Sequence, residues 1–183
     1  MLEVKGVKVA LVSFTAVSNG QSVAHAWSYN WAEPSRILRD AKRARRRGAD
    51  AVIVNLHWGT EFSHAISPAQ AALADRLTRS PAITAIVGQH VHVVQPISWV
   101  HRKPVVFGEG NLVSNQTAAC CPPESQDGLI ALIDFVARGG RVKANRVRYV
   151  PVWVRHPDYR VLPASRGSLS WRRTVSAAGR PPG

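Results

Sequence analysis

The segment ADAVIVNLHWG, residues 49–59, decides the predicted fold. Residues 52–56 are almost wholly apolar, which is typical of a strand in a sheet that is covered on both faces. His57 follows at the end of this strand, just before Trp58 and a glycine. Ligands of open α/β sheets collect beyond the carboxyl ends of the strands, so this histidine is predicted to lie on the functional rim of the sheet.

Strand and helix patterns alternate on both sides of this segment. Strands are predicted over residues 7–15 and 82–88, and helices over residues 35–48 and 67–80. The second helix begins with a predicted capping box, in which Ser67 and Gln70 satisfy free amide groups of the first turn. The order strand, helix, strand, helix, strand predicts a parallel sheet with crossover helices. Two strand pairs are predicted to follow, over residues 94–113 and 128–154, the second turning at Gly139 and Gly140.

The charge of the chain is strongly positive. Its 183 residues include 24 Lys and Arg against 11 Asp and Glu, for a formal net charge of +13. This predicts attraction to a polyanion, although a GC-rich genome would produce the same excess of arginine. The helix at residues 35–48 carries a basic run that is either a solvated face or a polymer-binding face. The residues of interest there are Arg43, Arg45, Arg46 and Arg47.

Nucleic acid is an unfavoured partner, because no aromatic residues are interleaved with the basic run. No apolar run approaches the ~20 residues that span a bilayer, and the first residues lack a signal-peptide pattern. The adjacent Cys120 and Cys121 are not expected to bond to each other, because a disulfide between neighbours distorts the peptide between them.

Three histidines are predicted to share the rim of the sheet. His90 and His92 lie two positions apart at the end of the third strand, so an extended backbone would point both imidazoles to one side. His57 can join them from the neighbouring strand. Imidazoles suit Zn, Mn or Fe, but such sites normally include carboxylates. Glu61 is a candidate to orient His57, and Asn111 is a candidate ligand contact or simply a turn residue.

Three segments, in this order and spacing, resemble one family. They are DAVIVNLHWGTEF, SPAQAALADRL and AIVGQHVHVVQPISWVHRKPVVFGEGNLV. They resemble the CapA family, also called PgsA, which is associated with poly-γ-glutamate capsule synthesis. That family is similar to the calcineurin-like metallophosphoesterases. The resemblance covers residues 5–155, with the densest motifs between residues 50 and 116.

The resemblance assigns roles to the three histidines. It implies that His57 is the histidine of the family's HWG motif, and that His90 and His92 are its paired metal-binding histidines. Asn111 then belongs to the family's LGN turn. This chain departs from the family pattern at three positions, which are Gln89, Val91 and Glu109.

The resemblance also implies an α/β fold, the second half of a calcineurin-like metallophosphoesterase sandwich. This half is a βαβαβ unit followed by β-hairpins, and it lacks the N-terminal strands. The family's first Asp-bearing strand and its Gly-Asp and Asn-His motifs, which supply metal carboxylates, are absent from this sequence. We therefore expect residues 1–155 to form the C-terminal portion of such a domain, and residues 156–183 to form a poorly structured tail.

Two classes of function remain open at this point. A complete family member is expected to be a metal-dependent, phosphoester-type hydrolase with two divalent ions, and its catalytic residues are unknown from this sequence. The alternatives are a non-catalytic component that holds the acidic polymer, or an inactive fragment. The expected partners are an acidic polymer or a phosphoester substrate, together with other capsule synthesis proteins. By resemblance, the expected location is the cell envelope or the extracellular space.

Overall fold

The computed structural model describes residues 1–20, 22, 25–138 and 141–179 of the chain. The elements in chain order are β1 (Leu2–Val4), β2 (Val7–Thr15), α1 (Pro34–Arg46), β3 (Ala51–Trp58), α2 (Pro68–Thr78), β4 (Ala85–His90), β5 (Ile97–Val100), β6 (Lys103–Val106), the 3-10 helix η1 (Pro123–Gln126), β7 (Asp127–Arg138), β8 (Arg141–Arg155), β9 (Arg160–Pro163) and α3 (Leu169–Ala178).

Six strands form a mixed sheet in the order β1-β2-β3-β4-β6-β5. The pairs β2–β3, β3–β4 and β4–β6 are parallel, and α1 and α2 cross over between the first three of these strands. The predicted strand, helix, strand, helix, strand unit is therefore confirmed. The edge strand β1 pairs antiparallel with β2 through a turn in which Lys5 and Gly6 both have positive φ. A mixed α/β fold is the result.

The main core lies between the six-stranded sheet and helices α1 and α2. Ile37 of α1 and Leu77 of α2 are fully buried in the same apolar cluster as Val54 and Leu56 of β3. Burying one such side chain stabilises the fold by about 1.5–3 kcal/mol. The capping box of α2 is present as predicted, because Ser67 and Gln70 bond reciprocally to each other's backbone amides.

The opposite face of β3 is only half-buried, which corrects the expectation of a strand covered on both faces. Ile53, Asn55 and His57 are partly exposed, whereas the residues on the helical side are buried. The reason is that the second sheet, β7-β8-β9, does not cover this part of the first sheet. A second apolar cluster, which includes Val94, Val106 and Leu129, joins the β4–β6 side to β7 instead.

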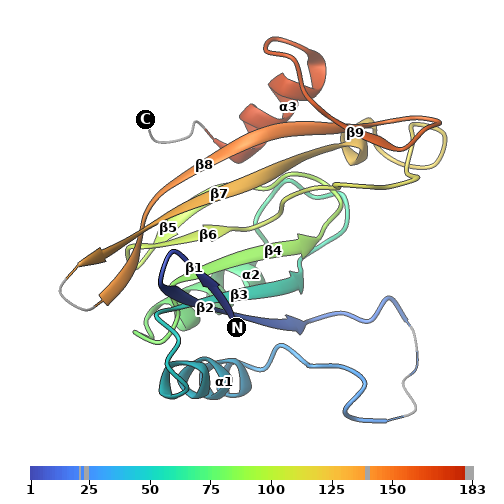
Figure 1. The fold of residues 1–183 in the computed structure, drawn as a ribbon. Helices are drawn as coiled ribbons and strands as arrows, with labels where there is room; N and C mark the ends of the chain where they lie inside the picture. Colours follow the sequence, from blue (N-terminus) through green and yellow to red (C-terminus); the bar gives the residue numbers. More distant parts are fainter. Residues whose placement is uncertain (21, 23–24, 139–140, 180–183) are drawn as a thin grey trace.

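Figure 1 shows the resulting arrangement of the elements. The helix α1 lies at the bottom of the view, the six-stranded sheet above it, the β7–β8 hairpin higher and α3 at the top. The two hairpin strands pair antiparallel along their length, as predicted. Their predicted turn at Gly139 and Gly140 lies outside the described residues.

Residues 156–183 were expected to form a poorly structured tail, and this is wrong for half of the segment. Residues 160–163 form β9, and residues 169–178 form α3. Ser168 caps α3 by accepting a hydrogen bond from the Trp171 amide at 3.2 Å. The buried residues of α3 are Thr174 and Ala178, which are too small and polar to produce a clear apolar period. Packing against η1, β7 and β8 therefore supports this helix more than its own sequence pattern does.

The loop before η1 contains a second departure from expectation. Cys120 and Cys121 are joined in a disulfide. A tight turn brings them together, since both of their backbone amides donate to the carbonyl of Thr117, at 3.0 and 2.9 Å. No helix among the described residues is long and apolar enough to cross a bilayer.

Candidate metal centre

The ends of β3 and β4 bring the three predicted histidines together. The register pairs Trp58 with His90, so His57 and His90 end neighbouring parallel strands at the same rim. The ring centroids of His57 and His90 lie 4.5 Å apart, and those of His90 and His92 lie 6.4 Å apart. Three imidazoles from two adjacent chain segments therefore face one region of space.

The spacing of two residues between His90 and His92 suggested an extended backbone. The backbone that carries these rings is not extended. The φ angles of His90 and His92 are 100° and 60°, in the region that non-glycine residues rarely occupy. Each such residue costs on the order of 1–3 kcal/mol, and such strain gathers at functional sites. A turn with positive φ at both histidines, rather than strand alternation, thus places the two rings.

The protein environment favours the neutral form of the two strand-end histidines. Burial, with a contribution from neighbouring imidazoles, lowers the pKa of both His57 and His90 below the usual value for histidine. The side chain of His90 is 6% exposed, and its Nδ1 has no hydrogen-bond partner. Glu61 Oε1 lies 4.0 Å from this atom. Glu61 was predicted to orient His57; its carboxylate lies beside His90, and its charge opposes the lowering of the pKa at both histidines.

His92 is oriented by Asn111, which the sequence offered as a ligand contact or a turn residue. Its Nδ1 lies 2.9 Å from Asn111 Oδ1, and its ring stacks on Phe62 with the centroids 5.9 Å apart. The amide of Asn111 thus contacts a histidine of the cluster directly. This places Asn111 behind an imidazole that is a candidate ligand.

Two of the departures from the family pattern meet in space. Gln89 pairs in register with His57, and its Nε2 donates to Glu109 Oε2 at 3.0 Å. Burial raises the pKa of Glu109, although the hydrogen bond from Gln89 opposes this. Sequence reasoning noted Glu109 only as a departure and missed it as a carboxylate beside the rim. The available signal in the sequence was that Gln89 and Glu109 both depart from the family pattern.

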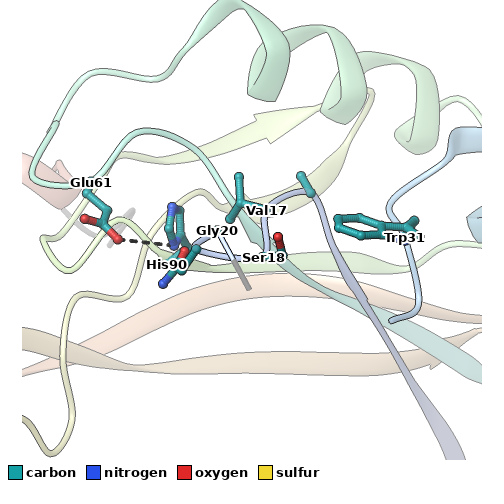
Figure 2. Close-up of a pocket in the computed structure, with 8 residues that line it drawn as sticks. Val17, Ser18, Gly20, Trp31, Glu61 and His90 are labelled. Carbon is teal, nitrogen blue, oxygen red and sulfur yellow. Dashed lines mark ion pairs between the residues drawn. The ribbon is translucent and has the colours of Figure 1, made fainter. Parts of the chain in front are cut away.

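An open pocket of about 440 Å³ lies beside the histidines. Figure 2 shows its lining, with Glu61 and His90 at one end, the loop of residues 17–20 in the middle and Trp31 at the other end. The pocket therefore offers an imidazole and a carboxylate together with an aromatic wall. A molecule bound there would lie against His90.

Three imidazoles are the candidate metal donors at this rim. Across residues 1–20, 22, 25–138 and 141–179, no group of three or more His, Cys, Asp or Glu side chains is arranged to hold a metal ion. The three imidazole rings lie next to one another, and His90 has an unpartnered buried nitrogen. These are the features of imidazole ligands, without the carboxylates that usually accompany them.

The basic helix separates into exposed and structural arginines. Arg43, Arg46 and Arg47 are exposed. Arg45 is not available to a polymer, because its guanidinium donates to the carbonyls of residues 49, 50 and 82 and to Thr84 Oγ1. The prediction that Arg45 contacts a polyanion is therefore corrected: this side chain ties the end of α1 to the sheet.

The chain is similar to known proteins of capsule synthesis. The family model described as bacterial capsule synthesis protein PGA_cap matches residues 1–116. The capsule biosynthesis protein CapA of Bacillus anthracis is 33% identical over 118 residues, which cover 62% of this chain and 28% of that protein. The PGA biosynthesis protein CapA of Bacillus subtilis is 31% identical over 116 residues, covering 62% and 30%.

A probable polyglutamine synthesis accessory protein of Mycobacterium tuberculosis is 33% identical over 72 residues, covering 39% of this chain and 19% of that protein. The chain thus spans less than a third of the length of each of these relatives. The family match contains all three histidines and Asn111, but it ends before η1, β7–β9 and α3.

Proposed function

This chain belongs to the bacterial capsule synthesis protein PGA_cap family, and we propose that its histidine cluster is the imidazole part of a divalent-metal site used in making an acidic capsule polymer. The observation that carries the proposal is the meeting of His57, His90 and His92 beside an open pocket, with one buried imidazole nitrogen unpartnered. The names of the relatives support the polymer as poly-γ-glutamate and the cell envelope as the place of action.

The residues of the cluster have distinct roles in this proposal. His57 and His90 present neutral nitrogens, and His92 is held by Asn111. The pocket between Glu61 and Trp31 receives the group that reacts. The three histidines would hold divalent ions, which would supply an activated water and positive charge for the oxygens of a phosphoester, the finer reaction class we propose. A dinuclear centre of this kind also needs carboxylates beyond those gathered around the three rings.

The proposal is tested by titrating the purified chain with Zn²⁺, Mn²⁺ and Fe²⁺ in a calorimeter. We expect Zn²⁺ to bind, and binding to be lost in the double variant His90→Ala/His92→Ala. The matched control is His25→Ala/His101→Ala, which removes two exposed histidines away from the cluster. The proposal is contradicted if the unaltered chain does not bind Zn²⁺, or if both double variants lose Zn²⁺ binding equally.

A second candidate function is the holding of the acidic polymer by α1. The exposed cations Lys42, Arg43, Arg46 and Arg47 form no ion pair among the described residues. Residues three and four apart lie on the same side of a helix, so these side chains form one continuous positive face. Like charges on one face repel each other, and an acidic polymer relieves this repulsion.

The polymer face is tested by the binding of poly-γ-glutamate at rising salt concentration. We expect affinity to fall with salt and to be lost in Arg43→Glu/Arg46→Glu/Arg47→Glu, because binding between exposed charges is screened. The control variant Arg102→Glu/Arg160→Glu/Arg166→Glu changes the net charge equally at exposed sites elsewhere. Equal affinity for DNA, for anionic lipid vesicles and for poly-γ-glutamate would reject a dedicated polymer surface.

A further inference from the structure

The orientation of the Asn111 amide is determined by its neighbours. Its Nδ2 lies 2.7 Å from the backbone carbonyl oxygen of Ser125 and 3.0 Å from Gln116 Oε1. A backbone carbonyl oxygen can only accept, so the side-chain atom facing Ser125 must be the amide nitrogen. The opposite atom, Oδ1, therefore faces His92. The flipped amide is excluded, because the backbone carbonyl of Ser125 has a fixed role as acceptor.

This orientation determines which nitrogen of His92 carries the hydrogen. Asn111 Oδ1 has only lone pairs to offer, and it lies 2.9 Å from His92 Nδ1. That nitrogen must then donate, which leaves the lone pair of neutral His92 on Nε2. A hydrogen bond at one ring nitrogen selects the tautomer in the same way at many metal-binding histidines.

Of the groups that hold Asn111, Gln116 is the last residue of the family match, and the others lie beyond it. Ser125 belongs to η1, and the backbone N–H of Asn111 donates to the carbonyl of Asp127 at 3.3 Å. The two segments approach closely because Gly128 has no side chain: a Cβ there would lie 2.2 Å from the Asn111 carbonyl oxygen. Arg173 of α3 pairs with Glu124 at 3.3 Å and fixes the other side of η1.

We propose that residues 116–127, held by α3, fix the orientation of the Asn111 side-chain amide. This amide holds His92 as its Nδ1–H tautomer, so that His92 presents Nε2 to the ligand of the cluster. Asn111 is thus a positioning residue. All of this segment except Gln116 lies outside the matched residues 1–116, and it controls a histidine inside them. The nature of the ligand rests on the proposed metal site, but the tautomer of His92 does not.

The first test measures the tautomer in the absence of any metal. Long-range proton–nitrogen NMR spectra of the chain labelled with ¹⁵N-histidine, recorded at pH 8, distinguish the two neutral forms. His92 is assigned by its loss in His92→Gln. We expect His92 to be a single Nδ1–H form in the unaltered chain and in Asn115→Ala, which changes an exposed residue of the same loop. We expect Asn111→Ala to populate the Nε2–H form.

The second test measures Zn²⁺ affinity of the same variants. Loss of a residue that orients a ligating histidine typically weakens metal binding about 10–100-fold, so we expect this change for Asn111→Ala and none for Asn115→Ala. A substantial Nε2–H population of His92 in the unaltered chain overturns the inference, even if Asn111→Ala fails to fold. A fixed Nδ1–H form without any Zn²⁺ binding would instead retain the inference and reject the proposed metal site.

Discussion

Replacing Gly88 by alanine should strongly destabilise the protein, because this glycine lies where β4 meets the end of β6. A Cβ at this position would lie 2.0 Å from the carbonyl oxygen of Phe107 and 2.3 Å from Trp58 Nε1. These two atoms form a hydrogen bond of 2.9 Å, and Trp58 is 2% exposed. The methyl group can be placed only by moving the backbone of residue 107 and separating this pair.

The size of the effect follows from three contributions. Overpacking a core costs about 1–3 kcal/mol. Leaving the buried indole N–H unpaired costs a further ~1–3 kcal/mol. The lower chain entropy of alanine in the unfolded state returns about 0.4–1 kcal/mol. We therefore expect Gly88→Ala to lower the free energy of unfolding by about 1–5.5 kcal/mol, with a centre of ~3 kcal/mol, a large part of the roughly 5–15 kcal/mol of a typical domain.

Urea denaturation followed by circular dichroism measures this change. The control is Gly48→Ala, where φ is +89° but no atom lies within 4 Å of the added Cβ. This variant pays only for the left-handed backbone, about 1–2 kcal/mol. If Gly88→Ala costs less than about 0.5 kcal/mol, or no more than Gly48→Ala, the close approach of β4 to residue 107 is not a tight constraint and the reasoning fails.

Three further outcomes are expected. In a double-mutant cycle measured by urea denaturation, Gln89→Ala and Glu109→Leu should couple by about 0.5–1.5 kcal/mol, because each removes the same hydrogen bond; additive effects would contradict the pairing. Arg45→Met should lower the thermal midpoint because it leaves carbonyl acceptors unsatisfied, whereas Arg46→Met on the exposed side of α1 should leave it nearly unchanged. Burial raises the pKa of Asp127, so the folded protein binds this proton more tightly than the unfolded chain does. Stability should therefore fall as pH rises from about 4 through the folded-state pKa, and Asp127→Asn should remove that part of the decline in pH-dependent unfolding curves.

The parts of the fold that the sequence predicted are those with a strong local pattern. The apolar run of β3 and the capping box at Ser67 each carry their own signal, and the parallel order follows from their alternation. Helix α3 was missed because its buried side chains are small, so that its stability depends on contacts with distant strands. The half-exposed face of β3 was missed because strand composition does not reveal where a second sheet stops.

The candidate site could be predicted only in its residue types. The histidines were found from their positions at strand ends, but the turn with positive φ at His90 and His92 has no sequence signature, since histidine rarely adopts it. The orientation of Asn111 depends on a backbone carbonyl 14 residues further along the chain. Arg45 shows the same limit, because the helical pattern of the sequence does not distinguish a guanidinium that turns toward the protein from one that turns toward solvent.

The hydrogen bond between Gln89 and Glu109 also has an evolutionary consequence. A chain that replaces Glu109 alone by the family's leucine leaves the Gln89 amide without this acceptor beside the histidine rim. Selection on position 109 is then linked to position 89, since this exchange passes through a less stable protein. The two positions are expected to change together along the lineage of this chain, so that an acidic residue at position 109 accompanies an amide at position 89.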